Sequence, residues 1–437
     1  MILLEGCRSV VTMNDAGAEL ENASILIDGG EITWVGSGRP PVREQPDTID
    51  GRGLVALPGL VNTHHHLYQT LTRVRAQQGG LFDWLRELYP VWASIDADWE
   101  RTAAEVGLAE LALSGCSTTT DHHYVFPSGT QGLLEAEIEV AEQIGLRFHP
   151  CRGSMDLGQS KGGLPPDSVV EDVDAVLTAT DEAITRFHDP APGSMLRIAV
   201  GPCSPFSVSP QLMRESAALA RRRGVRLHTH IAETLDEEAF CRKTFELRPL
   251  ELLEDLDFLG PDVWLAHCVH LGTPDIARLA ATRTRVAWCP TSNMRLGSGF
   301  APGREMLDAG VGVGLAVDGS ASNDSGNLLA EARMAMLTTR ARKGAAAMTA
   351  REALRVATRG GAACLGRDDI GSIEVGKRAD IALFAIDGLA YRGAESDPVA
   401  ALLFCNPGPV QHLFVEGRPV VHDGHLVNLS EASMIWA

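Results

Sequence analysis

The sequence Pro58-Gly59-Leu60-Val61-Asn62-Thr63-His64-His65-His66 places histidines two positions apart at the end of an apolar run. In a β-strand, side chains two apart point to the same face, so His64 and His66 can converge on one point while His65 points away. Two converging imidazoles at a strand end indicate a metal site. A histidine-rich surface loop is the alternative for an isolated His-x-His, so the rest of the chain has to decide.

Between Leu57 and about Gly366, apolar strands alternate with helical patterns such as residues 98–114 and 210–223. Eight such units predict a (β/α)8 TIM barrel, because near-continuous apolar strands are what a buried parallel sheet requires. An open doubly wound sheet is the alternative, but its glycine fingerprint is missing, since 310–314 reads as a helix stop followed by a crowded strand. The predicted strands are 59–66, 116–122, 146–151, 196–203, 225–231, 263–269, 285–290 and 311–317.

The two chain ends consist of short apolar or alternating runs separated by turn signals, such as Asp28-Gly29-Gly30 and Asp423-Gly424. Neither end is large enough to hold a good core alone, so we expect both to pair into one small β-sandwich domain. The predicted division assigns residues 1–56 and 367–437 to this β-domain and residues 57–366 to the barrel.

Composition excludes several classes of protein. The 437 residues include 38 Lys and Arg against 57 Asp and Glu, a formal net charge of −19 that argues against a nucleic-acid partner. The nine cysteines are scattered and contain no CxxC pair, which favours reduced thiols in a cytoplasm. No apolar run approaches the roughly 20 residues of a membrane span, and the start lacks a signal peptide's basic region. We therefore expect a cytoplasmic protein with no membrane partner.

Metal-competent side chains end four of the predicted strands. In a parallel barrel, active-site residues lie at the carboxyl ends of the strands, so these side chains should meet. Each has a simple structural alternative when taken alone, but chance would seldom place so many at four separate strand ends. They are His64 and His66 on strand one, His228 and His230 on strand five, His267 on strand six and Asp318 on strand eight.

Imidazoles with a carboxylate suit a single Zn²⁺ or Fe²⁺ ion that keeps a position for water. Such a metal lowers the pKa of its bound water to about 7. Glu233 follows His230 by three residues and leaves the strand near this site, as a proton shuttle should. His228 and His230 share a strand face, so alternation leaves the ligand open, and the spacing to Glu233 favours His230.

These residues resemble the amidohydrolase superfamily, in its mononuclear branch of guanine, cytosine and S-adenosylhomocysteine deaminases and triazine hydrolases. The resemblance spans nearly the whole chain. The shared segments are the stretch 58–66, His230 with Glu233, Leu265-Ala266-His267, Asp318-Gly319 with Ser322-Asn323-Asp324, and the tail Gly376-Lys377-Arg378-Ala379-Asp380.

The resemblance implies which residues do what. It implies one divalent metal ion, with Zn²⁺ favoured and Fe²⁺ open, bound by His64, His66, His230 and Asp318. Glu233 would protonate a ring nitrogen, His267 would hold the attacking water, and Asp318 would take its proton. Binuclear members carry a carboxylated lysine at the end of strand four, where this chain has Gly201-Pro202-Cys203-Ser204-Pro205, so one metal is expected.

A narrower similarity is to bacterial 8-oxoguanine deaminases, which hydrolyse the 2-amino group of 8-oxoguanine to give urate and ammonia. It implies a small heterocyclic substrate, and a homo-oligomer of two or more subunits. Deaminases of guanine or isoxanthopterin and triazine hydrolases stay open, but Asp318, which some triazine hydrolases lack, favours a deaminase. The similar segments are 68–73, 88–92, 121–124, 152–155, 162–166, 202–208 and 292–296.

A flat polar heterocycle needs a few directed polar groups and apolar walls. We expect Gln69 to bind the substrate edge, Trp92 to stack on the ring, and Cys203 to form a small neutral wall. A surface glutamine and a core tryptophan are the plain alternatives. The sequence leaves open which of His122 and His123 faces the pocket and how residues 73–97 fold. Arg152 and Asn293 are weaker candidates, and a non-catalytic protein that kept the metal site for stability remains a further possibility.

Overall fold

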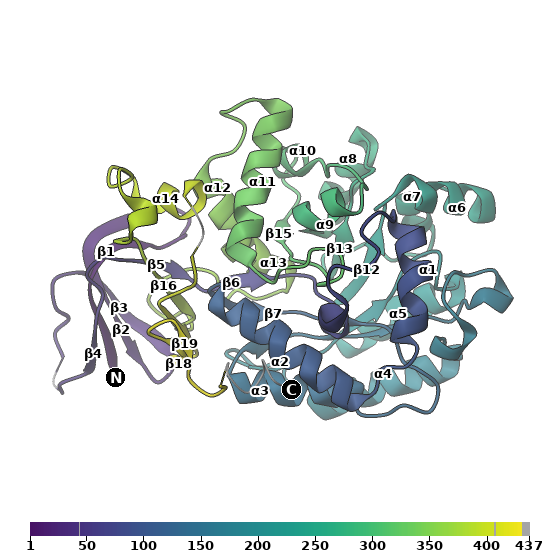
Figure 1. Ribbon diagram of the computed structural model, residues 1–437, viewed down its shortest axis with the longest axis horizontal. Helices are drawn as coiled ribbons and strands as arrows, with labels where there is room; N and C mark the ends of the chain where they lie inside the picture. Colours follow the sequence, from purple (N-terminus) through teal and green to yellow (C-terminus); the bar gives the residue numbers. More distant parts are fainter. Residues whose placement is uncertain (43, 406–407, 431–437) are drawn as a thin grey trace.

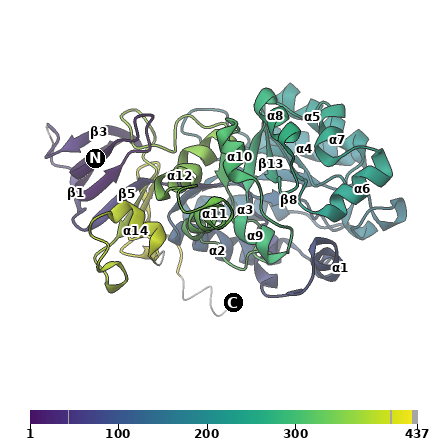
Figure 2. The same ribbon diagram turned by 90° about the horizontal axis from the view of Figure 1, so that it is seen from above.

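The computed structural model describes residues 1–42, 44–405 and 408–430. A β-domain containing both the first and the last strands lies beside a larger barrel (Figure 1). Seen from above, the helices α11 and α12 lie between the β-domain and the far side of the barrel (Figure 2). Within the described residues, no helix is both long and apolar enough to traverse a lipid bilayer.

The barrel strands are parallel and follow one another around the ring in chain order. The predicted second and third strands are each interrupted into two short strands. The barrel strands are β6 (Leu60–Asn62), β7 (Cys116–Thr119), β8 (His122–His123), β9 (Arg147–Phe148), β10 (Cys151–Ser154), β11 (Ala199–Pro202), β12 (Leu227–Ile231), β13 (Val263–His267), β14 (Arg285–Trp288) and β15 (Val313–Leu315).

The ring closes between the last strand and the segment after the first. The Thr63 N–H donates to the Leu315 carbonyl at 3.0 Å, and the Asp318 N–H donates to the His64 carbonyl at 3.1 Å. Gly314 lies at this seam, where an added Cβ would meet the Thr63 side chain at 2.7 Å and Gly361 Cα at 2.9 Å. The prediction of a (β/α)8 barrel with a β-domain built from both chain ends is confirmed.

The first barrel strand is shorter than predicted. It ends at Asn62, so His64 and His66 lie in an extended segment just beyond it rather than within the strand. The segment keeps strand-like alternation because its backbone bonds to both neighbours: the His64 carbonyl accepts from Asp318, and the His65 carbonyl accepts from His122 at 2.8 Å. The expected convergence of the two imidazoles therefore survives, although the strand boundary was wrong.

Helices cover the outside of the barrel and follow the predicted pattern. The predicted helix over 210–223 is α5, which begins after Ser209, whose side chain accepts from the Leu212 N–H, and ends at Gly224 with φ 67°. The helices are η1 (Leu67–Thr72), α1 (Leu81–Trp92), α2 (Ala97–Leu113), α3 (Leu133–Ile144), η2 (Gln159–Lys161), η3 (Asp167–Val169), α4 (Val173–Phe187), α5 (Pro210–Arg223), α6 (Leu235–Phe245), α7 (Pro249–Asp255), α8 (Thr273–Thr282), α9 (Pro290–Arg295), α10 (Gly303–Asp308), α11 (Leu328–Lys343), α12 (Ala350–Arg355), η4 (Val356–Gly360), α13 (Gly361–Cys364), η5 (Leu389–Tyr391) and α14 (Pro398–Phe404).

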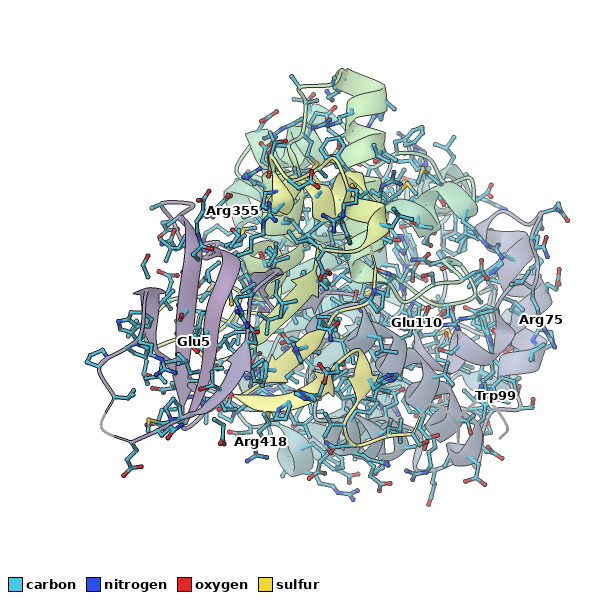
Figure 3. All side chains as sticks on the ribbon, turned by 60° about the vertical axis from the view of Figure 1, so that its left-hand side comes forward. Glu5, Arg75, Trp99, Glu110, Arg355 and Arg418 are labelled. Atoms are coloured by element: carbon cyan, nitrogen blue, oxygen red, sulfur yellow. The ribbon has the colours of Figure 1, made fainter. Side chains whose placement is uncertain are left out.

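Strands from the two chain ends share one mixed sheet. Glu5 on β1 and Arg418 on β18 mark its N-terminal and C-terminal parts (Figure 3). The junction is the antiparallel pair of β5 with β16, and β1 also pairs with β2, β4 and β5. The strands are β1 (Ile2–Val11), β2 (Glu19–Asp28), β3 (Glu31–Ser37), β4 (Asp47–Asp50), β5 (Leu54–Pro58), β16 (Ile381–Ala385), β17 (His412–Val415), β18 (Arg418–His422) and β19 (His425–Leu426).

A buried ion pair fastens the barrel to this sheet. The Arg147 guanidinium, on β9, donates to the two oxygens of Asp380 at 3.0 and 2.9 Å and to Glu416 at 2.7 Å. A planar guanidinium that meets a carboxylate with two parallel bonds fixes orientation as well as distance. The β-domain is thus held against the base of the barrel, away from the strand ends that carry the histidines. The residue limits of the domains stay a prediction.

Candidate active site

A cavity of about 370 Å³ lies at the carboxyl ends of the barrel strands. Its wall includes Leu81, Trp84, Leu85 and Tyr89 of α1, so the segment whose fold the sequence left open forms one side of the pocket. The polar groups that face it come from the strand ends and the segments after them, and from η1. They include His66, Gln69, His230, Glu233, His267 and Asp318.

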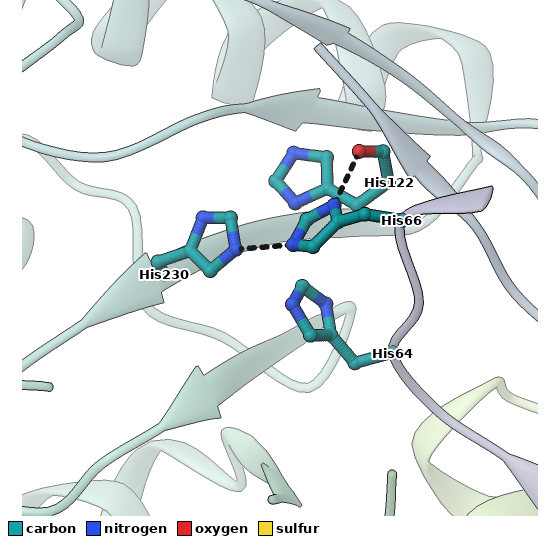
Figure 4. A group of neighbouring side chains, drawn as sticks. All are labelled: His64, His66, His122 and His230. Atoms are coloured by element: carbon teal, nitrogen blue, oxygen red, sulfur yellow. Dashed lines mark hydrogen bonds between the residues drawn. The ribbon is translucent and has the colours of Figure 1, made fainter. Parts of the chain in front are cut away.

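The imidazoles of His64, His66 and His230 converge, with the His122 ring beside them (Figure 4). The Nε2 atoms of His66 and His230 are 3.1 Å apart. The centroid of the His64 ring is 4.6 Å from that of His66 and 4.7 Å from that of His230. All three side chains are buried. The structure therefore brings together histidines that are 164 residues apart in the chain.

Hydrogen bonds fix which nitrogen of each ring is free. The Nδ1 of His66 bonds to the His122 carbonyl at 2.8 Å, and the Nδ1 of His230 bonds to the Cys203 carbonyl at 2.7 Å. A carbonyl only accepts, so both Nδ1 atoms carry protons and both Nε2 atoms present lone pairs. Two lone pairs 3.1 Å apart repel unless a cation lies between them. This donor set fits a divalent metal ion.

His64 is held by His228, which the sequence alone could not distinguish from His230 as a candidate metal ligand. The Nδ1 of His228 bonds to the Trp264 carbonyl at 2.7 Å, so its Nε2 accepts from the Nδ1 of His64 at 2.8 Å. The Nε2 of His64 is thereby left with a lone pair, and no described residue gives it a hydrogen bond. His228 orients His64 from behind, whereas His230 lines the cavity.

Asp318 completes the group. Its Oδ1 lies 3.3 Å from the His64 Nε2 and 3.4 Å from the His66 Nε2. Burial alone would raise the pKa of Asp318, but the contacts with His64 and His267 hold that pKa well below its usual range. Burial lowers the pKa of His66 and of His230 well below the ordinary histidine value. The group therefore offers a carboxylate and neutral imidazoles, which are the protonation states that bind a metal.

Glu233 and His267 stand on the cavity side of this group. The Glu233 Oε2 is 3.6 Å from the His267 Nε2, which is in turn 3.9 Å from the Asp318 Oδ2. Burial raises the pKa of Glu233 to about 7, although His267 opposes the shift. Burial alone would lower the pKa of His267, but Glu233 and Asp318 raise it. A carboxyl with a pKa near neutrality can both give and take a proton.

Two adjacent residues of α9 orient two of these groups. The Ser292 hydroxyl donates to the Asp318 Oδ2 at 2.5 Å, and the Asn293 Oδ1 accepts from the His267 Nδ1 at 2.9 Å. Asp318 and His267 both have positive φ, 64° and 71°, which strains a residue other than glycine. Sequence reasoning missed Ser292 and ranked Asn293 low. The sequence feature that could have identified both residues is the start of a short helix directly after strand seven.

Replacing Asn293 with alanine should lower kcat about tenfold or more and leave the metal content unchanged. The amide oxygen fixes the tautomer and ring plane of His267, and misplacing a group that orients a reactant by about 1 Å can cost about 10²-fold in rate. Steady-state kinetics with metal analysis would measure this. Met294→Ala, on the same helix, is the control. An Asn293→Ala enzyme as fast as the wild type would contradict the role of this bond.

The three predicted pocket residues have different positions. Gln69 lines the cavity, and its buried Oε1 has no hydrogen-bond partner among the described residues. Cys203 also lines it, and burial raises the pKa of its thiol to about 12, so it is a neutral wall rather than a nucleophile. Trp92 is outside the described lining: its ring packs edge-on against Tyr68 and Trp84. Trp84, which sequence reasoning missed, provides the indole in the wall.

The histidine pair at the end of strand two divides between two roles. The His122 ring stacks on His230 with centroids 4.8 Å apart, and its Nε2 bonds to the Gly201 carbonyl at 2.8 Å. His123 points the other way, to Glu137 at 2.7 Å and the Val125 carbonyl at 2.9 Å. Arg152 is bound to Glu171 at 2.8 Å, away from the pocket wall. His122 thus supports the ligand group, and His123 belongs to the packing behind it.

A parallel barrel whose strand ends gather three imidazole lone pairs, a carboxylate and a protonatable glutamate defines a metal-dependent hydrolase. The chain belongs to the amidohydrolase family, whose model matches residues 55–420.

Characterised relatives match over nearly the full length. An 8-oxoguanine deaminase of Pseudomonas aeruginosa is 45% identical over 421 residues, which is 96% of this chain and 94% of that protein. An isoxanthopterin deaminase from an unknown prokaryotic organism is 37% identical over 92% of each chain. The structure of atrazine chlorohydrolase from Arthrobacter aurescens TC1 complexed with zinc is 38% identical, covers 100% of this chain and 98% of its own, and superposes with a TM-score of 0.96.

Proposed function

We propose that the protein is a metal-dependent deaminase of aminated N-heterocycles and that its substrate is 8-oxoguanine, which it converts with water to urate and ammonia. The observation that carries the reaction type is the buried Glu233 carboxyl, which faces the cavity beside the group of imidazole lone pairs. The choice of ring rests on the 8-oxoguanine deaminase that is 45% identical over 96% of this chain.

The proposed metal ligands are His64, His66, His230 and Asp318, and the proposed metal is one Zn²⁺ ion per chain. Zinc is supported by the similar atrazine chlorohydrolase, which was solved with zinc, and Fe²⁺ would suit the same ligands. When bound, such an ion supplies a Lewis acid that lets water attack at neutral pH. The nearby His267, which together with His64 and Asp318 also offers ligand atoms within 4.8 Å of one another, is proposed to orient the attacking water and is left out of the ligand set.

The chain's own residues move the protons. Glu233 gives its proton to the ring nitrogen next to the amino-bearing carbon, and His267 orients the water that adds to this carbon. Asp318 takes a proton from the water and passes it to the amino group. The exocyclic C–N bond then breaks, and ammonia leaves. Glu233 takes the remaining hydroxyl proton, so the carbon becomes a carbonyl and every group returns to its starting state.

The pocket suits an uncharged flat ring. No lysine or arginine is among the described residues that line it, so it offers no partner for a phosphate or carboxylate. We propose that the unpaired oxygen of Gln69 accepts a hydrogen bond from the ring, that Trp84 and Tyr89 form the flat walls, and that Cys203 leaves room at one edge. We further propose a homo-oligomer, and a β-domain of residues 1–56 and 367–437 around a barrel of residues 57–366.

The zinc-loaded protein should release ammonia from 8-oxoguanine faster than from isoxanthopterin or guanine. An enzyme-coupled ammonia assay, with urate followed by absorbance, would measure this over one range of substrate concentrations. The isoxanthopterin deaminase at 37% identity makes that ring the second candidate. Ammonia released only from isoxanthopterin would mean that isoxanthopterin is the substrate, with the reaction type unchanged. No ammonia from any of the three would contradict the proposed function, and chloride released from a chlorotriazine would indicate a chlorohydrolase.

A further inference from the structure

We infer that Glu237 is a positioning residue for the acid Glu233. Its carboxylate holds the short turn that carries Glu233, so catalysis depends on a side chain that lies behind the pocket wall. This inference rests on the proposed function, because Glu233 needs a fixed direction only if it transfers a proton.

The turn between β12 and α6 is tied down on both sides. It contains Ala232, whose φ of 53° is a left-handed conformation that a residue other than glycine rarely adopts. The Ala232 carbonyl accepts from the N–H groups of Val269 and His270, both at 2.9 Å, which ties the turn to the end of β13. On the other side, Glu237 accepts the Ala232 N–H and the Glu233 N–H, both at 2.8 Å.

The contacts of Glu237 differ from those of an ordinary helix cap. The cap of α6 is Thr234, whose hydroxyl accepts the Glu237 N–H at 3.3 Å. In a capping box, the glutamate three residues later would accept the N–H of the cap residue itself. Glu237 instead extends past Thr234 to the two preceding residues. Its two oxygens each hold one backbone N–H of the turn, so the carboxylate serves the turn rather than the start of the helix.

The burial of Glu237 explains why its carboxylate needs the two N–H groups of the turn. Its side chain is fully buried, and no ion pair of the described residues includes it. Burying a carboxylate without a cationic partner is unfavourable unless hydrogen bonds satisfy its oxygens. The two N–H groups of the turn provide those bonds. The carboxylate and the strained turn therefore stabilise each other.

Glu233 itself has few contacts that could aim it. Its carboxylate oxygens lie 3.5 Å from the Ser298 hydroxyl and 3.6 Å from the His267 Nε2, longer than strong hydrogen bonds. The direction of the side chain is consequently set by its backbone. If the turn relaxed, the carboxyl would move relative to the substrate, and a misplacement of about 1 Å can cost about 10²-fold in rate.

The test compares Glu237→Gln and Glu237→Ala with the control Glu238→Gln on the same helix turn. Glu238 is partly exposed and pairs with Arg242 at 2.9 Å and with Arg248 at 3.7 Å, whereas the N–H groups of Ala232 and Glu233 bond to Glu237. We expect kcat to fall about tenfold in Glu237→Gln, which keeps one acceptor oxygen, and about 10²-fold in Glu237→Ala, which keeps none. KM and the metal content should stay unchanged, because the ligands and the pocket walls are intact. Glu238→Gln should match the wild type.

Two further measurements separate positioning from general stability. In a Glu233→Gln background, adding Glu237→Gln should cause little further loss of rate, since Glu237 acts only through Glu233. A crystal structure of Glu237→Gln should show the residue 233 side chain displaced from His267 with the metal site intact. That crystal structure tests the inference independently of any activity measurement. If Glu237→Ala does not fold, Glu237→Gln alone is sufficient for the test.

A Glu237→Gln enzyme with wild-type kcat and an unmoved Glu233 would overturn the inference while leaving the proposed function standing. A loss of rate that persists in full in the Glu233→Gln background would also overturn it. A wild-type protein that releases no ammonia from any heterocycle would refute the proposed function instead, and the position of Glu233 in the crystal would still test the role of Glu237.

Discussion

Replacing Glu233 with glutamine is expected to leave the metal content at the wild-type level and to lower kcat by about 10²–10⁴-fold, the range for loss of a general acid–base group. Glutamine keeps the shape of the side chain but cannot give a proton to the ring nitrogen or take one back. Because Glu233 lies on the cavity side of the histidine group, its loss should not open the metal site. Steady-state kinetics with 8-oxoguanine and metal analysis of the same sample would measure both effects.

Glu87→Gln provides a control on α1, since Glu87 is an exposed carboxylate on the helix whose other side covers the pocket. It should leave kcat unchanged. A protein that kept its metal site only for stability would show no turnover before or after the Glu233→Gln change. Full activity in Glu233→Gln would instead show that another group protonates the ring.

Replacing His64 with alanine should reduce the bound metal well below one ion per chain and abolish turnover with it. The change removes one of three converging lone pairs and leaves the Nε2 of His228 without its partner. Loss of an outer-sphere partner alone already costs 10–100-fold in metal affinity, and His64 is proposed as a direct ligand. Metal analysis after dialysis against a weak chelator, followed by titration with Zn²⁺, would measure the change in affinity.

The matched control is the variant His65→Gln, which changes the adjacent residue in the same histidine run. His65 is buried on the other side of the segment, where its Nδ1 lies 4.0 Å from Asp121. The His65→Gln variant should keep about one metal ion per chain, even if the protein becomes less stable. Equal loss of metal in both variants would mean that His64→Ala acts through the fold, and full metal occupancy in His64→Ala would refute the strand-one assignment.

The fold was predictable because its signals are local. Apolar strands alternating with helical patterns specify a buried parallel sheet covered by helices, and Ser209 and Gly224 mark both ends of α5. Strand ends were less predictable. The first strand stops at Asn62, and the chain beyond it keeps its alternation through bonds to Leu315, Asp318 and His122. Such long-range bonds leave no mark in the nearby sequence.

The candidate site was predictable where each residue ends a strand. His64, His66, His230, His267 and Asp318 meet because parallel strands bring their carboxyl ends to one edge. The pocket wall was not predictable in the same way. Trp84 and Trp92 lie on the same helix with similar apolar neighbours, and only the packing of α1 over the barrel turns Trp84 to the cavity and Trp92 to Tyr68.

The alternation of apolar strands with helical patterns determined the barrel, and the stretch from Pro58 to His66, with the histidines and carboxylates at the other strand ends, determined the chemistry that it can hold. Side-chain alternation and the common direction of parallel strands require nothing beyond the local sequence. The tertiary structure alone decided the tautomers, the supporting bonds of His228, Asn293 and Glu237, and the wall formed by Trp84. These depend on contacts between segments far apart in the chain, whose approach is set by packing rather than by local residue pattern.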